Sequence, residues 1–123
     1  MRWLRIDGHA VQVPAGTTIL EAARQVGVTI PTLCWRQGYE CGTSCMVCAV
    51  KVAGRPRLLP ACAAPVESGM EVTTDDDEVR RHRREVLELL LSEHTGDCEG
   101  PCRLACPAHL DTPGLLRRAQ RGE

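Results

Sequence analysis

Near the start of the chain, apolar and polar residues alternate in two short runs. Leu4 and Ile6 are the apolar positions of the first run, and Val11 and Val13 are those of the second. Alternation with a period of two is typical of a β-strand that buries one face. The Asp-Gly pair at positions 7–8, between the two runs, favours a type I′ turn. The pattern therefore predicts a β-hairpin.

The next segment changes from strand periodicity to helix periodicity. Thr18 and Glu21 have the spacing of a capping box, and Gly27 stands where the C′ residue of a helix is expected. Between them the apolar residues recur at helical spacing: Ile19, Ala22, Ala23 and Val26. A short helix is predicted here.

Three further strands are expected, from residue 47 to Gly54, over 57–59 and over 71–73, with a turn at Ser68-Gly69 before the last of them. A hairpin, a short helix and then more strands is the element order of a sheet wrapped over one helix. The pattern therefore predicts an α+β fold of the β-grasp type.

A longer helix is expected from Asp75 or Asp76 to about Glu93, with Thr95-Gly96 ending it. Its apolar residues lie on one stripe: Val79, Val86, Leu87, Leu90 and Leu91, with Leu89 at the edge.

After a loop, Asp111 or Thr112 is expected to cap a last helix that has Pro113 in its first turn and Gly122 at its end. The elements divide the chain into a β-grasp domain over 1–75, a connecting helix over 76–94 and a small Cys-rich helical segment over 95–123.

Composition shows that this fold needs support beyond its apolar core. The 123 residues include 43% hydrophobic residues but no Phe, one Tyr and two Trp, so the core is modest. Small domains of this kind often depend on disulfides or metals, and the chain has eight Cys. No apolar run is long enough for a signal peptide or a membrane span, so a cytoplasmic protein is expected. In that compartment, clustered Cys residues favour metal binding over disulfides.

Charge gives no sign of a nucleic-acid partner. The net charge is −1, and the one basic run, over 80–84, follows an acidic run over 75–78. On a helix, Asp76 and Arg80 form one of several i,i+4 pairs of opposite charge. The basic run is therefore interpreted as a solvated helix face whose charges pair with one another.

Five cysteines make up the first candidate site: Cys34, Cys41, Cys45, Cys48 and Cys62. Cys45 and Cys48 form a C-x2-C pair, Cys62 lies a strand and a turn beyond it, and the fourth ligand is either Cys34 or Cys41. The Cys41 alternative gives a run that misses the plant-type C-x4-C-x2-C spacing by one residue. Small residues in this loop allow backbone N–H groups to approach a ligand. A four-cysteine zinc site is the other possibility, although zinc sites commonly use two C-x2-C pairs and this segment has one.

Several stretches together resemble the [2Fe–2S] ferredoxin-type domain of large oxidoreductase subunits. They are "VPAGTTILEAARQVGVTIPTLCW", the C-x10-C-x2-C-x13-C spacing, "AVKVAG", "LLPACAAPVESGMEV" and "LELLLSEH", and they cover roughly residues 4–94. Such domains occur in the large iron–sulfur subunit of complex I, in iron-only hydrogenases and in NAD-linked formate dehydrogenases. The resemblance implies a β-grasp fold and a [2Fe–2S] cluster held by four ligands, Cys34, Cys45, Cys48 and Cys62. Cys41 is then an additional thiol that the family pattern lacks.

The second cysteine set is similar to two families. In complex I-like subunits the same domain precedes a [4Fe–4S] site with one His and three Cys ligands, which implies His94, Cys98, Cys102 and Cys106 here, although the internal spacing differs. The stretch "GPCRLACPAHLDTPGLLRRAQRGE" is similar to the N-terminal cluster domain of the glutamate synthase small subunit. In that family, later cysteines complete the clusters. His94 could instead cap the preceding helix, and His109 is interpreted as a loop residue.

The expected function is one-electron transfer. The sequence has no nucleotide-binding motif and no arguable catalytic triad, so catalysis by this chain alone is not expected. The resemblance implies redox partners such as a flavoprotein NAD(P)H oxidoreductase, a hydrogenase, a formate dehydrogenase or a glutamate-synthase-like flavoprotein. A structural zinc protein and a ubiquitin-like interaction module are the alternatives from other classes.

Overall fold

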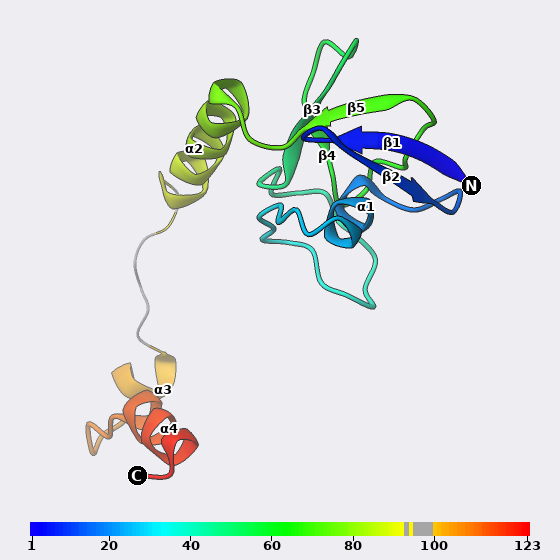
Figure 1. Ribbon diagram of the computed structural model, residues 1–123. Coiled ribbons are helices and arrows are strands. Elements are labelled where there is room, and N and C mark those ends of the chain that lie inside the picture. The colour runs from blue at the N-terminus through cyan, green and yellow to red at the C-terminus, as the bar shows by residue number, and fades with distance from the viewer. Residues whose placement is uncertain (93, 95–99) are drawn as a thin grey trace. The chain divides into compact units, whose positions relative to one another are not determined.

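The computed structural model describes residues 1–92, 94 and 100–123, and its internal contacts divide the chain into two units, Met1–Leu91 and Ser92–Glu123. The first unit contains a five-stranded mixed sheet in the order β2-β1-β5-β3-β4, with α1 against one face (Figure 1). β1 pairs with β5 in parallel, and the other neighbours are antiparallel. The elements of this sheet and its helix are β1 (Arg2–Ile6), β2 (His9–Val13), α1 (Ile19–Gln25), β3 (Ala49–Val52), β4 (Leu59–Pro60) and β5 (Met70–Thr73). The arrangement confirms an α+β fold and is consistent with the predicted β-grasp type.

The predicted hairpin and its turn are confirmed. β1 and β2 pair with Ile6 opposite His9, and the two residues between them have positive φ, 47° for Asp7 and 84° for Gly8. That geometry matches the right-handed twist of the two strands. Asp7 also accepts a hydrogen bond from the backbone N–H of Thr74 at 2.8 Å, which ties the turn to the end of β5.

The capping box of α1 is confirmed as well. The hydroxyl of Thr18 accepts from the backbone N–H of Glu21 at 3.3 Å, and the Glu21 carboxylate accepts from the backbone N–H of Thr18 at 2.9 Å. The helix buries one face against the sheet, and Gly27 follows it with φ 73°. The core that forms between helix and sheet includes Leu4, Ile6, Val13, Ile19, Leu20, Val50 and Val72.

The bounds of the last three strands differ from the prediction. β5 begins at Met70 instead of residue 71, and β3 ends at Val52 instead of Gly54. β3 begins at Ala49 rather than at residue 47, because the N–H of Ala49 donates to the carbonyl of Met46 at 3.2 Å and closes a turn. β4 covers only Leu59 and Pro60 instead of residues 57–59, since these two are the residues that pair with β3. Alternation in the sequence cannot show where cross-strand pairing stops.

α2 (Asp77–Ser92) begins within two residues of its predicted start. The Asp76 carboxylate accepts from the N–H of Val79 at 2.8 Å and so caps the helix. Val79 is the one residue of the helix that is buried in the structure as described, whereas Leu87 and Leu90 are each 44% exposed. The predicted stop at 95–96 lies outside the described residues.

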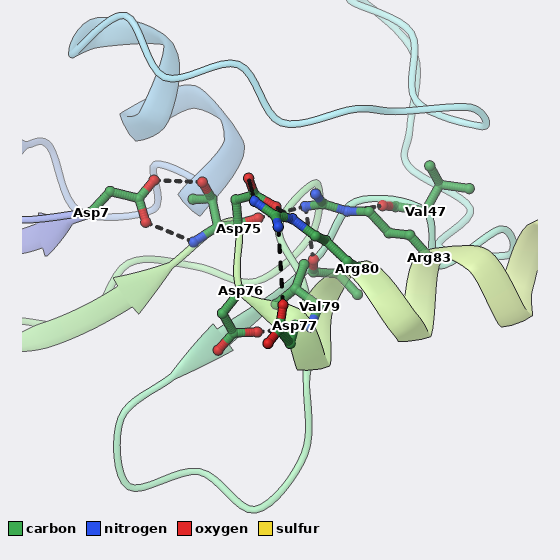
Figure 2. Close-up of polar contacts among 10 residues, drawn as sticks. Asp7, Val47, Asp75, Asp76, Asp77, Val79, Arg80 and Arg83 are labelled. Atoms are coloured by element: carbon green, nitrogen blue, oxygen red, sulfur yellow. Dashed lines mark hydrogen bonds and ion pairs between the residues drawn. The ribbon is translucent and has the colours of Figure 1, made fainter.

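The pairing of Arg80 differs from the prediction. Its guanidinium donates to both oxygens of Asp75, at 2.7 and 2.8 Å (Figure 2). The Asp76 carboxylate instead lies 3.5 Å from the Nζ of Lys51 on β3. The predicted i,i+4 ion pair between Asp76 and Arg80 is therefore wrong, because the Asp76 carboxylate caps the helix and lies near Lys51 instead.

The second unit contains α3 (Pro101–Leu104), which the sequence did not predict, and α4 (Thr112–Arg121), which it did. Asp111 accepts from the N–H of Gly114 at 3.2 Å, and Gly122 ends the helix with φ 74°. A Cβ at Gly114 would lie 2.1 Å from an oxygen of Asp111, so a larger residue there would require the Asp111 carboxylate to move. Of the residues between 92 and 123 whose burial the structure describes, none is buried. Within the described part of the chain, no helix is both long and apolar enough to cross a bilayer.

Candidate metal centre

The first cysteine set lies on the loop between α1 and β3 and on the turn that follows β4. The predicted loop is confirmed, and its backbone takes unusual conformations at two positions between Cys41 and Cys48. Thr43 has φ 47° and Met46 has φ 54°, although neither is a glycine. Left-handed backbone costs free energy for such residues and is found preferentially at functional sites. The loop therefore has the character of a ligand-binding segment.

All five thiols of this set are free, and three of them are buried. Cys48 and Cys62 are 1% and 3% exposed and belong to the hydrophobic core, while Cys45 is 6% exposed. Cys34 and Cys41 are half-buried on the loop. The packed core therefore fixes one side of the site, and the loop supplies the other.

The sulfur atoms approach one another closely. The Sγ atom of Cys62 lies 2.9 Å from that of Cys41 and 3.2 Å from that of Cys48. A disulfide would bring two sulfurs to about 2.05 Å, so neither pair is bonded as a disulfide. Cys34 makes hydrogen bonds with Cys45 and with Ser44. The five cysteines therefore form two groups in contact: Cys41 and Cys48 around Cys62, and Cys34 beside Cys45. The short C-x2-C segment from Cys45 to Cys48 connects the two groups along the chain.

The Cys34 thiol is the one poised to ionise near neutral pH. Hydrogen bonds from the backbone and side chain of Cys45, and then from Ser44, lower the pKa of Cys34 from 9.0 to about 7. Metals bind the thiolate form of cysteine, so a lowered pKa reduces the free energy required to deprotonate this ligand. Loop residues thus donate hydrogen bonds to the Cys34 sulfur, and the assignment of Cys34 as a cluster ligand stays a prediction.

Cys62 has the opposite environment. Burial raises the pKa of this thiol above its usual value, and the adjacent side chains of Cys41 and Cys48 raise it further. A bound metal supplies the positive charge that such a buried thiolate lacks. Soft thiolates in this number are the donor set that iron–sulfur clusters and zinc use. The residues present therefore fit a thiolate-ligated cluster.

Cys41 and Cys34 both remain able to supply the fourth ligand. Cys41 contacts Cys62, and Cys34 contacts Cys45. Across residues 1–92, 94 and 100–123, no three His, Cys, Asp or Glu side chains are arranged as a preformed site for a metal ion.

The second set is described only in part. Cys98 lies outside the described residues, nothing is described of the Cys102 side chain, and His94 is exposed. Cys106 is half-buried, and hydrogen bonds from the backbone N–H groups of Leu110, Ala108 and His109 lower its pKa. His109 has φ 50° and lies in this turn, as expected for a loop residue. The sequence did not predict this turn, whose N–H groups contact the Cys106 sulfur, although it contains the Cys-Pro pair with which the turn begins.

Arg83 is a residue that the sequence analysis assigned wrongly. It belongs to the basic run interpreted as a solvated face, but it is half-buried and reaches across to the cysteine loop (Figure 2). Its Nε donates to the carbonyl of Val47 at 3.2 Å, and its Nη2 donates to the carbonyls of Ala49 at 3.3 Å and Thr74 at 2.9 Å. No sequence signal distinguishes it from Arg81 or Arg84 in the same run.

Comparison with known proteins identifies the family. Residues 3–77 match the 2Fe-2S iron-sulfur cluster binding domain family, and the chain belongs to that family. This confirms the resemblance to [2Fe–2S] domains of oxidoreductase subunits.

Curated relatives are subunits of redox enzymes. The chain is 44% identical over 95 residues to the NADPH-Fe(3+) oxidoreductase subunit alpha of Geobacter sulfurreducens, covering 77% of this chain and 11% of the relative. It is 44% identical over 114 residues to the NADP-reducing hydrogenase subunit HndD of Solidesulfovibrio fructosivorans, covering 85% and 20%. The mitochondrial NADH-ubiquinone oxidoreductase 78 kDa subunit of Candida albicans is 40% identical over 93 residues, covering 76% and 13%. The chain therefore spans a fifth or less of the length of these relatives.

A solved structure supports the same assignment. A chain in the crystal structure of an NAD+-reducing [NiFe]-hydrogenase in the H2-reduced state superposes with a TM-score of 0.69 and 34% sequence identity. The match covers 80% of this chain and 42% of that chain. Together with the curated relatives, it supports an electron-transfer role for this iron–sulfur domain.

Proposed function

We propose that the first cysteine set holds a [2Fe–2S] cluster on Cys34, Cys45, Cys48 and Cys62, and that the chain relays single electrons through it. When bound, the cluster supplies a centre that accepts and releases one electron at a time. The convergence of five thiols on one loop and core edge, in a chain of this family, carries the proposal.

Cys34 is the preferred fourth ligand because its environment already stabilises the thiolate. Its pKa is lowered to about 7, and it sits beside Cys45. Cys41 is then a neighbouring thiol that contacts Cys62 without serving as a ligand. The choice is tested with Cys34→Ser and Cys41→Ser. The first should remove or alter the EPR signal of the two-iron centre, and the second should leave it unchanged; the reverse result would make Cys41 the ligand.

A [4Fe–4S] cluster on His94, Cys98, Cys102 and Cys106 forms the second part of the proposal. The N–H groups that lower the pKa of Cys106 support a thiolate at this position. With this second centre, residues 1–75 are the [2Fe–2S] domain, 76–94 the connecting helix, and 95–123 the cluster-binding segment.

The proposed partners are redox proteins. A flavoprotein NAD(P)H oxidoreductase would supply electrons, and a hydrogenase, a formate dehydrogenase or a glutamate-synthase-like flavoprotein would exchange them. The names of the relatives, an NADPH-Fe(3+) oxidoreductase and an NADP-reducing hydrogenase, support this class. We place the reaction in the cytoplasm, where reducing conditions keep unligated thiols free.

The decisive experiment is metal and sulfide analysis of anaerobically purified protein, with low-temperature EPR after reduction. One two-iron and one four-iron centre give about six irons per chain. Cys48→Ser should lose the first centre and Cys106→Ser the second, so each variant serves as the control for the other. Colourless protein that contains zinc and no sulfide would contradict the proposal and favour the structural zinc alternative.

A further inference from the structure

Arg83 connects α2 to the two residues that flank Cys48. Its guanidinium donates to the carbonyl of Val47, immediately before Cys48, and to the carbonyl of Ala49, immediately after it. The third acceptor is the carbonyl of Thr74 at the end of β5. The three bonds fix the guanidinium against the backbone of the cysteine loop.

In the part of the chain that the structure describes, the Arg83 guanidinium is not paired with a carboxylate. Within the described residues, no Asp or Glu forms an ion pair with Arg83. Asp75, the acid whose charge acts on it, has both oxygens bound by Arg80. The half-buried side chain remains charged, since a guanidinium does not deprotonate in proteins.

The charge lies beside the Cys48 segment, because the carbonyls that the guanidinium contacts belong to the residues on either side of Cys48. Burial lowers the pKa of Arg83, and Asp75 together with an ionised Cys48 sulfur acts against that shift. Cys48 is 1% exposed, and interactions with buried groups are screened little by salt. A positive charge at this point therefore favours any added negative charge on the ligands of the first centre.

We propose that Arg83 sets the reduction potential of the first centre by holding a positive charge against the Cys48 segment. The inference rests on the proposed [2Fe–2S] cluster. Reduction adds one electron and thus one negative charge to the centre, and a nearby fixed cation stabilises the reduced state more than the oxidised state. Arg83 therefore raises the potential.

Two substitutions separate the charge of Arg83 from its hydrogen bonds. Arg83→Gln keeps an N–H donor for the loop carbonyls but removes the charge, whereas Arg83→Lys keeps the charge and loses the forked geometry. Arg84→Gln is the matched control, because Arg84 lies on the same helix and is exposed. The measurement is an EPR-monitored redox titration of the full, cluster-loaded chain, together with thermal unfolding.

Arg83→Gln should shift the midpoint to more negative potential, raising the oxidised-to-reduced ratio at a fixed potential several-fold. Tenfold corresponds to about 59 mV for one electron. Arg83→Lys should stay near the parent midpoint even if its melting temperature falls, and Arg84→Gln should not move the midpoint.

Three results would overturn the inference: an unchanged midpoint in Arg83→Gln, equal shifts in Arg83→Gln and Arg83→Lys, or loss of the centre in both. Equal shifts or loss would show a role limited to holding the loop. Failure of the proposed function itself is distinguishable, because the unsubstituted chain would then contain no cluster to titrate.

Discussion

The two cysteine sets are supported by very different parts of the molecule. The first set lies in a unit whose hydrophobic core includes Cys48 and Cys62 themselves. The second set lies in a unit, Ser92–Glu123, that contains two helices and no buried residue among those whose burial is described. The first cysteine set is therefore part of a packed core. In the described part of the second unit, the helices have caps but bury no side chain.

The difference teaches that similar ligand chemistry can have different relations to folding. In the first unit, burial of apolar side chains offsets the entropy lost on ordering the chain, so the loop is held before a metal binds. In the second unit, that contribution is small, and metal binding would have to provide the folding free energy. The first unit would therefore fold without its cluster, whereas the second unit would need a bound cluster in order to fold.

Removal of iron should show the largest contrast. When clusters are stripped with a chelator under reducing conditions, the strands β1 and β5 should keep their amide protection, because their packing does not depend on metal. The helix α4 should lose protection, because the second unit would lose the metal–ligand bonds that order it. Hydrogen exchange followed by mass spectrometry of the fragments from each unit measures both.

Full protection of α4 in iron-free protein would contradict this view. It would show that contacts of the helix, rather than a cluster, order the second unit. Cys106→Ser provides a matched control, since it should reproduce the loss at α4 while leaving the first unit and its cluster intact.

Truncation of a leucine should sharpen the same contrast at the level of packing. Leu20 is 0% exposed on α1, and Leu116 is 64% exposed on α4. Leu20→Ala should lower the free energy of unfolding by about 2–5 kcal/mol, because it leaves a cavity in the core. Leu116→Ala should change it by no more than about 0.5 kcal/mol. Urea denaturation followed by circular dichroism measures both, and equal losses would mean that Leu116 is packed in solution.

Thiol reactivity should reveal a feature that the two regions share. Backbone N–H groups lower the pKa of Cys34 to about 7 and also lower the pKa of Cys106, whereas burial raises that of Cys62. In iron-free protein at pH 7.5, iodoacetamide should therefore modify Cys34 and Cys106 well before Cys62. Labelling of Cys34 should rise with pH around a midpoint near 7.

The sign of the effect on stability follows from the same shift. A thiol whose pKa is lower in the folded chain contributes stability above its unfolded pKa, and that contribution is lost as pH falls through the folded value near 7. Peptide mapping by mass spectrometry reads the labelling rates residue by residue. Modification of Cys62 at the rate of Cys34 would show that the buried thiol is not held in the core.

Local signals in the sequence predicted most of the fold. The Asp7 turn and the Thr18 capping box depend on neighbouring residues, and both are present as predicted. The start of β3, directly after Cys48, depends on contacts that the alternation of residues does not show, so its boundary was missed. Arg83 was misassigned for the same reason, because its acceptors lie 36, 34 and 9 residues away in the chain. The cysteine spacing showed which thiols could gather but could not choose between Cys34 and Cys41, since both lie on the loop.

Helix caps should give the smallest effect and the finest test of whether the two regions are independent. Thr18 caps α1 through the backbone N–H of Glu21, and Asp111 caps α4 through that of Gly114. Thr18→Ala should lower the free energy of unfolding of the first unit by about 1 kcal/mol, and Thr18→Ser should restore it. Asp111→Ala removes a similar cap, but α4 has no buried residue, so the loss should appear as fraying of that helix and leave the urea midpoint of the first unit unchanged. If Asp111→Ala instead shifted that midpoint as far as Thr18→Ala does, the two units would unfold as one, and the second cysteine set would share the scaffold of the first.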